Sequence, residues 1–493
     1  MSKLLRSAKD VVSRNSLVKT KAYINGNWIA SEKTFPVLSP ASREIISEVT
    51  DVGAGNVRSA IEAASTAFKS WSEFNCKERS VLMNTFYRNV LNHKEELAQI
   101  MTAECGKPIR ETRVEVNYGA SFLEWFAEEA KRIDGDVLAR TNSTDRRLVF
   151  KQPIGIVGLI TPWNFPLAMI TRKVGAAMAA GCTSVIKPSE ETPLTALALA
   201  AIAEESGIPP GVLNVLPSSR QSTAMVGDMF CNSPDISKIS FTGSTAVGKL
   251  LLKQSADTVK RVSMELGGNA PFIVFNSADI ENVKKSAMFA KFRANGQTCV
   301  AANRFIVQSG IHAKFVEEMT KMVQNLKVGD PFDDDTEISS LINEQAVDKV
   351  ERHVNDAVEK GCKLIVGGGR HELSPTYYKP TIVDECSPDM MVMTDETFGP
   401  VISITKFETE EEAIQIANNS RGGLAGYLFS QDISQIFRVS EKIEAGMVGV
   451  NEGAISSEMI PFGGVKESGI GREGSRYGVN DYLELKYVCL GGI

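Results

Sequence analysis

Short apolar runs alternate with longer stretches of helical periodicity in the middle of the chain. Residues 154–160 are continuously apolar, which is typical of a strand buried on both faces of a parallel sheet. The spacing of apolar residues predicts further strands at 183–186, 213–216 and 236–241, and helices at 169–180, 194–205 and 246–255. Strands that alternate with helices in this way indicate a doubly wound α/β sheet.

A second series of the same kind follows. Strands are predicted at 271–275, 304–308 and 363–366, with helices at 280–292, 313–326 and 346–360. Towards the N-terminus, residues 22–28 predict a hairpin that turns at Asn25-Gly26, and residues 53–135 are predicted to be helical. Residues 146–151 alternate apolar and charged positions, which predicts either a strand exposed on one side or an edge strand that needs a partner. Residues 481–489 alternate in the same way and are expected to be another edge strand.

Composition limits the classes of function. The 493 residues exceed the roughly 250–300 at which a single core stops growing, so two or three domains are expected. The net charge of −6 gives no nucleic-acid footprint, and no run approaches the ~20 apolar residues of a membrane span. Eight dispersed cysteines indicate free thiols in a reducing compartment, and isolated histidines argue against a metal site. His312 and His353 lie in charged helical stretches and are predicted to be surface residues.

The first 21 residues are basic. Lysines and arginines at positions 3, 6, 9, 14, 19 and 21 accompany a single acid, Asp10. This composition fits a mitochondrial transit segment, and it fits equally well a frayed basic arm. The mitochondrial matrix is therefore the predicted compartment, with the cytoplasm as the alternative.

Cys299, in the stretch FRANGQTC, and Glu265, in MELGGN, are candidates for acyl chemistry. A thiol can attack a carbonyl, and a carboxylate can activate the water that releases the acyl group. Taken singly, a Cys is more often a small buried hydrophobe and a Glu more often a solvated side chain. The remaining motifs have to decide between these interpretations.

The turn from Phe241 to Lys249 joins a predicted strand to a predicted helix. Its glycines let backbone approach a ligand, and a helix N-terminus favours an anion. Gly243 and Gly248 have P-loop spacing, but Leu250 replaces the Ser or Thr that would hold magnesium, which argues against a nucleoside triphosphatase. The GxGxxG dinucleotide fingerprint is absent. The turn is interpreted either as a phosphate site or as a plain glycine-rich turn.

Two other turns follow predicted strands, where ligands of α/β sheets bind. In the stretch 161–166, Asn164 can donate its amide to an oxyanion, or can simply make the turn between two prolines. In the stretch 187–190, Lys187 and Glu190 can hold ribose hydroxyls. The alternative is an exposed helix start with Ser189 as its N-cap.

Together these stretches resemble the aldehyde dehydrogenase superfamily, in the family's order and over residues 22–493. The matching pieces are Pro162–Pro166, Lys187–Glu190, Phe241–Ser244, Met264–Gly268, Gly296–Cys299, Glu396–Pro400 and Pro461–Lys466. Several ordered motifs are far more specific than any one of them.

The resemblance implies a domain organisation. After the N-terminal segment 1–21, it implies a Rossmann-like NAD-binding domain at 22–137 and 157–266, an α/β catalytic domain at 267–464, and a small β oligomerisation element from strands at 138–156 and 478–493. It also implies a homo-oligomer, with a tetramer favoured, and no nucleic-acid or membrane partner.

The resemblance also assigns the site. It makes Cys299 the nucleophile, Asn164 an oxyanion donor together with the Cys299 backbone N–H, and Glu265 the base that activates water. It implies no metal. Because Glu190 should repel a 2′-phosphate, NAD is favoured over NADP as cofactor. The cofactor contacts that it implies are Thr161, Pro162, Trp163, Lys187, Pro188, Ser189, Glu190, Gly243, Ser244, Thr245, Gly248, Glu396 and Phe398.

Within the superfamily, the chain is similar to succinate-semialdehyde dehydrogenases. Stretches typical of that subgroup are Ile170–Lys173, Lys291–Arg293, Val450–Gly453 and Tyr482–Cys489. The similarity implies NAD-dependent oxidation of succinate semialdehyde to succinate, through a thiohemiacetal and a thioester on Cys299. It further implies that the substrate carboxylate is held by Arg172, Arg293 and Ser456, of which the two arginines would otherwise be interpreted as surface residues.

Other functions stay open at this point. Glutarate semialdehyde is an alternative substrate, and a CoA-acylating enzyme is less favoured because Glu occupies position 265. The non-redox alternatives are a P-loop-like nucleotide-binding enzyme at Gly243–Lys249 and a Cys hydrolase, although no His lies in a candidate segment. Ala301 stands where several relatives have a second Cys, so no regulatory disulfide with Cys299 is expected.

Overall fold

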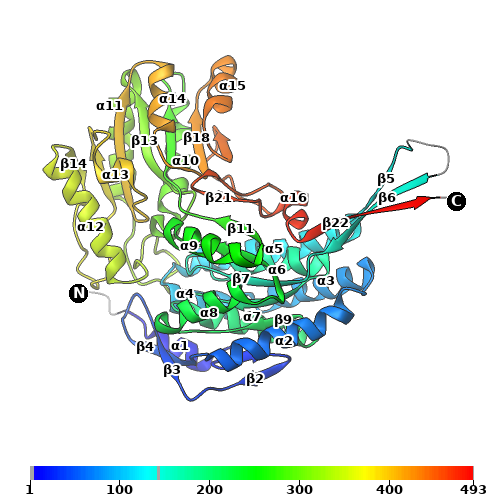
Figure 1. The fold of residues 1–493 in the computed structure, drawn as a ribbon. Helices are drawn as coiled ribbons and strands as arrows, with labels where there is room; N and C mark the ends of the chain where they lie inside the picture. The colour runs from blue at the N-terminus through cyan, green and yellow to red at the C-terminus, as the bar shows by residue number, and fades with distance from the viewer. Residues whose placement is uncertain (1–4, 141–144, 492–493) are drawn as a thin grey trace.

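The computed structural model describes residues 5–140 and 145–491, which form two lobes and a projecting arm (Figure 1). Among these residues, the first lobe is built on an eight-stranded sheet in the order β2-β1-β9-β8-β7-β10-β11-β21. The strands from β9 to β11 run parallel, and the strands at both edges are antiparallel. Their bounds are β1 Ala22–Ile24, β2 Asn27–Ile29, β7 Ile156–Ile160, β8 Thr183–Lys187, β9 Leu213–Val215, β10 Ile236–Thr242, β11 Arg261–Glu265 and β21 Gly469–Ile470.

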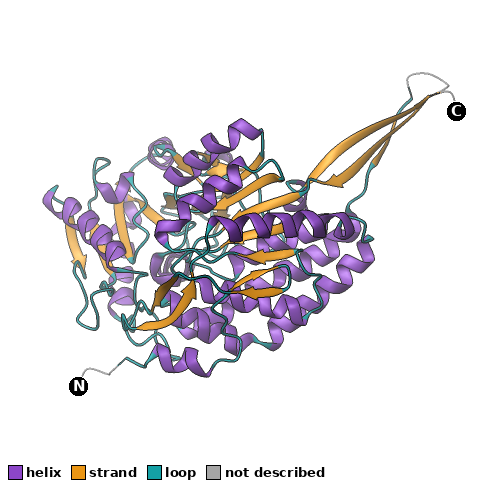
Figure 2. Ribbon diagram, turned by 60° about the horizontal axis from the view of Figure 1, so that its bottom comes forward, coloured by secondary structure: helices purple, strands orange, loops and turns teal. Residues whose placement is uncertain are grey.

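Alternation of side chains explains the continuous apolar run of β7. Val157 and Leu159 pack into the core on one face of the sheet, and Ile156 and Ile160 pack into the core on the other. Helices cover both faces (Figure 2). The first core contains α3 Cys76–Asn92, α4 Lys94–Cys105, α5 Ile109–Glu129, α6 Ala168–Ala180 and α7 Pro193–Glu205, and the second contains α2 Ala54–Trp71, α8 Arg220–Asn232 and α9 Thr245–Ser255.

The second lobe contains a seven-stranded sheet within the described chain, in the order β14-β15-β16-β13-β12-β18-β19. In its inner strand β12, Phe272 and Val274 face one core and Ile273 faces another, so this sheet is also covered on both sides. The strands are β12 Ala270–Val274, β13 Ala302–Gln308, β14 Lys363–Val366, β15 Thr381–Asp384, β16 Val401–Phe407, β18 Ala425–Phe429 and β19 Met447–Val450. The helices are α10 Ile280–Phe292, α11 Ser309–Gln324, α12 Glu344–Glu359, α13 Met391–Thr394, α14 Glu410–Asn418 and α15 Ile433–Lys442.

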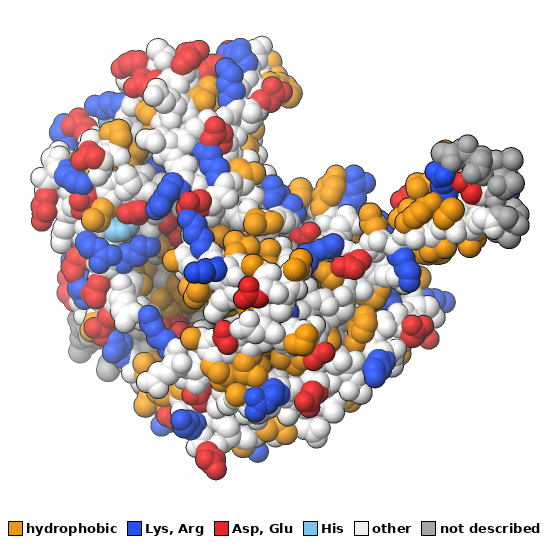
Figure 3. Space-filling view, viewed as in Figure 1, with side chains coloured by type: hydrophobic (Ala, Val, Ile, Leu, Met, Phe, Trp, Pro, Cys, Tyr) orange, Lys and Arg blue, Asp and Glu red, His pale blue; other side chains and the backbone are white. Residues whose placement is uncertain are grey.

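The two predicted edge strands pair with each other in the arm. β6 Asp145–Pro153 runs antiparallel to β22 Leu483–Gly491, and β5 Asp136–Leu138 pairs with the other edge of β6. The arm extends away from both lobes, and hydrophobic side chains line it (Figures 1 and 3). Val137 and Leu485 are 79% and 71% exposed there. These large apolar side chains form an exposed surface along the arm.

The structure confirms the predicted fold class and corrects three expectations. Residues Ala8–Arg14 form helix α1, and Ala8 and Val12 are buried in the core of the first lobe, so the frayed-arm interpretation is wrong for these residues. Residues 1–4 of the predicted segment lie outside the described residues. His312 and His353 are buried rather than exposed, because each side chain meets a buried polar partner, Asp384 at 2.8 Å and Thr397 at 3.3 Å.

Sequence periodicity missed several elements. The hairpin of β3 Thr34–Leu38 and β4 Ile45–Thr50, strand β11 and strands β15, β16, β18 and β19 were not predicted. No helix within residues 5–140 and 145–491 is long and apolar enough to cross a bilayer. In the same ranges, no three His, Cys, Asp or Glu side chains are grouped as a metal site. The domain boundaries given above stay predictions.

Candidate active site

The order of the first sheet places the candidate site. The chain moves from β7 through β8 to β9 in one direction and then from β10 to β11 in the other, so the topological switch point lies between β7 and β10. Ligands of doubly wound sheets bind beyond the carboxyl ends of the strands at such a point. Backbone bonds tie the predicted turns together there: Thr161 N donates to Lys187 O at 3.2 Å, and Gly243 N donates to Glu265 O at 3.0 Å.

Cys299 follows a sharply turned loop of the second lobe. After α10, Ala294, Asn295 and Gly296 have left-handed backbone conformations, with φ of 52°, 57° and 76°. Gly268, just beyond β11, packs against this loop so closely that a Cβ would collide with the carbonyl oxygen of Cys299. Only glycine fits such an approach. The contact brings the end of β11, and with it Glu265, next to the thiol loop.

Burial dominates the chemistry of the Cys299 thiol. It raises the pKa of Cys299 to about 12, and the negative charges of Glu396 and Glu265 add to the effect, whereas the positive charges of Arg172 and Arg293 oppose it. A thiol of this kind is protonated at neutral pH. A nucleophilic attack by Cys299 therefore needs a neighbouring base to take its proton.

Glu265 is the candidate for such a base. Its side chain is 3% exposed, and neither carboxylate oxygen has a hydrogen-bond partner among the described residues. Burial, reinforced by the negative charge of Glu473, raises the pKa of Glu265 well above its ordinary value. A buried carboxylate without partners among the described residues is costly, so its position and its raised pKa both indicate a functional group.

A buried ion cluster lies beside Glu265. Lys173 and Arg172, neighbours on α6, both pair with Glu473, and Lys173 also donates to Ser240 Oγ at 2.9 Å. Burial alone would raise the pKa of Glu473, but the charges of Lys173 and Arg172 hold it below its ordinary value. Glu473 is therefore the ionised carboxylate of the cluster and Glu265 the protonatable one.

Asn164 reaches the same loop from the end of β7. It is buried, and its Nδ2 donates to Gln297 O at 3.0 Å, two residues before Cys299. Its Oδ1 has no partner among the described residues. The second N–H group of the Asn164 amide therefore remains available to another acceptor, beside the loop that carries the thiol.

The predicted cofactor contacts follow β8 and β10. Lys187 ends β8 in a buried position, with its Nζ 3.5 Å from Glu190. Ser189 does not cap a helix, because α7 begins at Pro193, and that alternative is wrong. Ser244 instead caps α9, accepting from Val247 N at 3.4 Å, and this places Gly243, Thr245 and Gly248 around the helix N-terminus.

Orphaned buried atoms at these strand ends fit a bound ligand. Thr161 Oγ1 and Thr242 Oγ1 are buried without a partner in the part of the chain that the structure describes. Such atoms cost free energy unless a ligand or water bonds them. Pro162 and Pro188 hold the turns next to them. Together with the adjacent helix N-terminus they suit a polar ligand that carries phosphate.

Glu396 and Phe398 belong to the second lobe and contact residues of the first lobe near the thiol loop. Glu396 Oε1 accepts from Gly268 N at 3.0 Å, and burial raises the pKa of Glu396. Phe398 meets the ring of Trp163 edge-on at 5.6 Å between centroids. These contacts tie the second lobe to the turn after β7 and to Gly268. The nicotinamide contacts of Glu396 and Phe398 stay predictions.

A cavity of about 610 Å³ opens next to the thiol loop. Arg293 and Ser456 line it, together with Tyr118, Phe165 and Phe289. The Arg293 guanidinium lies over the rings of Phe165 and Phe289, 5.1 and 5.2 Å from their centroids. No carboxylate of the described residues forms an ion pair with it. Arg172 is not in the lining: it is buried behind the cavity, where it donates to Tyr118 Oη.

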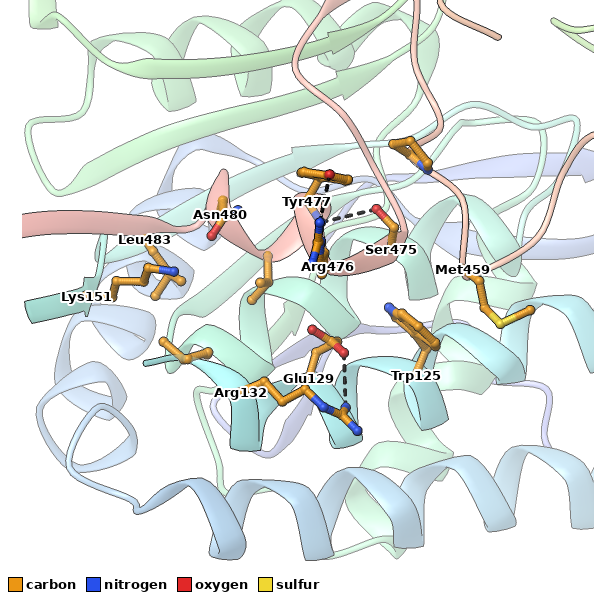
Figure 4. A pocket seen from close by; sticks show the side chains of 13 residues that line it. Trp125, Glu129, Arg132, Lys151, Met459, Ser475, Arg476, Tyr477, Asn480 and Leu483 are labelled. Atoms are coloured by element: carbon orange, nitrogen blue, oxygen red, sulfur yellow. Dashed lines mark hydrogen bonds and ion pairs between the residues drawn. The ribbon is translucent and has the colours of Figure 1, made fainter. Parts of the chain in front are cut away.

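A second cavity, of about 550 Å³, lies at the base of the arm (Figure 4). It contains none of the predicted site residues. Trp125 and Glu129 of α5 face Arg476 and Tyr477 of α16 Ser475–Asn480 across it, and Lys151 of β6 closes one end. Its position links it to the arm rather than to the thiol.

Comparison with known proteins identifies the family. A model of the aldehyde dehydrogenase family matches residues 28–488. The chain belongs to the aldehyde dehydrogenase family. The mitochondrial succinate-semialdehyde dehydrogenase of Rattus norvegicus is 54% identical over 478 residues, which cover 97% of this chain and 91% of that protein. The predicted resemblance is thereby confirmed.

Two solved structures share this fold closely. Succinate-semialdehyde dehydrogenase from Burkholderia pseudomallei is 47% identical with a TM-score of 0.95, and the match covers 97% of this chain and 98% of that one. An E. coli structure described as an NADP dependent enzyme is 46% identical with a TM-score of 0.95, over 96% and 98% of the two chains. The protein is an oxidoreductase of aldehydes, and enzymes of its family use NAD or NADP.

Sequence reasoning missed some residues of this aldehyde dehydrogenase site. Glu473, Tyr118 and Gln297 contact predicted site residues, yet none was predicted. Gln297 stands inside the thiol motif and could have been found there. Glu473 and Tyr118 lie 301 and 54 positions from Arg172, and no local pattern marks a partner at that separation.

The buried cluster gives a test of its own. In Glu473→Gln, the negative charge beside Glu265 disappears and Lys173 loses its partner, so the pKa of Glu265 is expected to fall and its carboxylate to ionise at lower pH. Infrared difference spectra between each protein and its Glu265→Gln counterpart follow this ionisation. Glu467→Gln removes the same charge from the surface pair with Lys249 and should leave the pKa of Glu265 unchanged. An unchanged or higher pKa of Glu265 in Glu473→Gln would refute the electrostatic account.

Proposed function

We propose that this aldehyde dehydrogenase oxidises succinate semialdehyde to succinate with NAD. The observation that carries the proposal is the unpaired Arg293 guanidinium in the cavity beside Cys299. A guanidinium binds a carboxylate through two parallel hydrogen bonds, so a short aldehyde with a terminal carboxylate fits this position. The names of the rat and B. pseudomallei relatives support the same substrate. Glutarate semialdehyde is the alternative that differs by one methylene.

The chemistry assigned to the chain is as follows. The Cys299 sulfur bonds to the aldehyde carbon while the thiol proton passes to Glu265, whose raised pKa suits it to accept that proton. The second N–H of Asn164 Nδ2 and the Cys299 backbone N–H stabilise the oxyanion. When bound, the nicotinamide cofactor accepts the hydride that converts the adduct to a thioester. Glu265 passes the thiol proton to solvent and then takes a proton from a water molecule, whose oxygen bonds to the thioester carbon. The C–S bond breaks, the acid leaves, and the proton on Glu265 returns to the Cys299 sulfur.

The cofactor preference follows from charge. Lys187 and Glu190 are placed to bond the adenosine ribose hydroxyls, and the carboxylate of Glu190 would repel a phosphate on the 2′ oxygen. The buried Thr161 and Thr242 hydroxyls and the capped N-terminus of α9 fit the rest of a dinucleotide. NAD is therefore favoured over NADP, although the E. coli neighbour is described as NADP dependent.

We further propose a homo-oligomer, with a tetramer favoured, in mitochondria. The arm presents Val137, Phe150, Leu485 and Tyr487 to solvent, and each is at least 46% exposed. Covering this surface with a second copy of the chain would remove apolar area from water. The mitochondrial location rests on the names of relatives such as the rat enzyme and on the basic residues near the N-terminus.

The substrate is tested by NAD(P)H formation with succinate semialdehyde, glutarate semialdehyde and butanal, each with NAD and NADP. Arg293→Ala should raise the KM for succinate semialdehyde about 10- to 100-fold, because charge-assisted hydrogen bonds contribute about 1.5–3 kcal/mol. The KM for butanal should change little. Arg110→Ala is the matched control, because Arg110 lines the same cavity but already pairs with Glu337 at 3.5 Å. Equal effects of Arg293→Ala on both aldehydes would reject Arg293 as the carboxylate ligand.

The role of Glu265 is tested by rapid mixing. Glu265→Gln should slow both the first NADH release and the steady-state turnover about 10²–10⁴-fold relative to the wild type, because the carboxylate that takes the thiol proton and activates water is gone. Cys299→Ala should give neither NADH release nor turnover, and Glu467→Gln, at the surface, should resemble the wild type. Full steady-state turnover by Glu265→Gln would contradict the proposed role of Glu265.

The arm is tested by the mass of the particle in solution. Leu485→Glu introduces a charge into the exposed apolar row of β22 and is expected to yield smaller particles in analytical ultracentrifugation at micromolar concentration. Val358→Glu makes the same change at a 42% exposed position on α12, in the other lobe, and should leave the mass unaltered. A wild-type protein that sediments as a monomer would contradict the proposed assembly directly.

A further inference from the structure

The loop that carries Cys299 also carries Arg293, so its shape sets the distance between the two groups. Between them, Ala294, Asn295 and Gly296 reverse the chain through successive left-handed residues. This conformation costs free energy in residues other than glycine, and Asn tolerates it best. A shape of this kind persists only where the surroundings hold it in place.

Asn295 supplies that support. Its side chain is fully buried, and both the oxygen and the nitrogen of its amide form hydrogen bonds with one neighbouring segment. Its Oδ1 accepts from Ser339 N at 2.9 Å, and its Nδ2 donates to Ser340 O at 2.9 Å and to Ser339 Oγ at 3.2 Å. The amide thus satisfies backbone N–H and C=O groups of a segment that is not part of a sheet.

The segment 339–342 is itself fixed to both lobes. It is buried and lies outside helices and strands, so other groups must satisfy its backbone. Ile342 N donates to Gln297 Oε1 at 2.9 Å, which adds a second bond to the thiol loop. Ser339 Oγ donates to Gly106 O at the end of α4, in the first lobe. The thiol loop is therefore held by hydrogen bonds to a buried segment and not exposed to solvent on this side.

We propose that Asn295 is a positioning residue that fixes the separation of Arg293 and Cys299 and thereby selects the length of the carboxy-aldehyde. The inference rests on the proposed function, in which Arg293 binds the carboxylate and Cys299 attacks the aldehyde carbon. The number of methylenes between these two substrate groups has to match the spacing of their partners. A rigid loop favours one length, whereas a loosened loop accepts its neighbours and loses reactive alignment.

The test compares kcat/KM for succinate and glutarate semialdehyde. Asn295→Gly keeps the left-handed backbone accessible but deletes the amide, and it should reduce the ratio between the two substrates about tenfold. The loss should fall on the preferred carboxy-aldehyde, with a much smaller change for butanal, which does not use Arg293. Asn295→Asp retains an acceptor for Ser339 N and should lie between the wild type and Asn295→Gly. If Asn295→Gly does not fold, Asn295→Asp is judged by the same ratio.

Asn214→Gly is the matched control. Asn214 is equally buried, accepts from Asn25 N at 3.0 Å and donates to Gly211 O at 2.8 Å and Ser184 O at 3.3 Å, all away from the carboxyl ends of the strands. It should lower the melting temperature, as Asn295→Gly does, without altering the substrate ratio. An Asn295→Gly enzyme with the wild-type ratio would overturn the inference. A wild-type enzyme that oxidises neither carboxy-aldehyde would overturn the proposed function, and the inference with it.

Discussion

The contact between Gly268 and the carbonyl oxygen of Cys299 joins the two lobes at the site, and the rest of the arrangement depends on it. Gly268 continues the strand that ends in Glu265, and Cys299 ends the loop that begins at Arg293. Any side chain at position 268 would separate the thiol from the carboxylate. The same residue donates its N–H to Glu396, so one short stretch of backbone aligns the thiol, the base and a candidate cofactor contact.

Burial then sets the electrostatics of this seam. It raises the pKa of both Cys299 and Glu265, so it opposes a negative charge on either group. Moving a proton from the thiol to the carboxylate keeps a single negative charge in the same low-dielectric space, and burial therefore opposes the transfer less than it opposes either ionisation alone. The positive charges of Arg172 and Arg293 act on the thiol side and favour the thiolate. Glu473 acts on the carboxylate side and favours protonation of Glu265.

Local patterns predicted what depends on local chemistry. The buried run at 154–160 became β7, because its alternate residues enter two different cores, and the turns after β7, β8 and β10 converge because parallel strands end at one edge. The misses share a physical cause. His312 and His353 were predicted from charged neighbours, but a partner from another element decides whether an imidazole can be buried. Glu473 was invisible for the same reason, since its partners on α6 are brought to it only by the fold.

Charge accounting in the cavity connects these points to selectivity. Lys107 pairs with Glu115, and Arg110 pairs with Glu337. Arg172 is buried and pairs with Glu473, and its charge favours the thiolate of Cys299. Arg293, next to aromatic rings, forms no ion pair within the described residues, although Glu111 lines the same cavity and its charge interacts with that of Arg293. Burial raises the pKa of Glu111, which weakens it as a counter-ion for Arg293. A substrate carboxylate can form charge-assisted hydrogen bonds with the guanidinium, whereas an uncharged aldehyde cannot, so discrimination arises from these bonds.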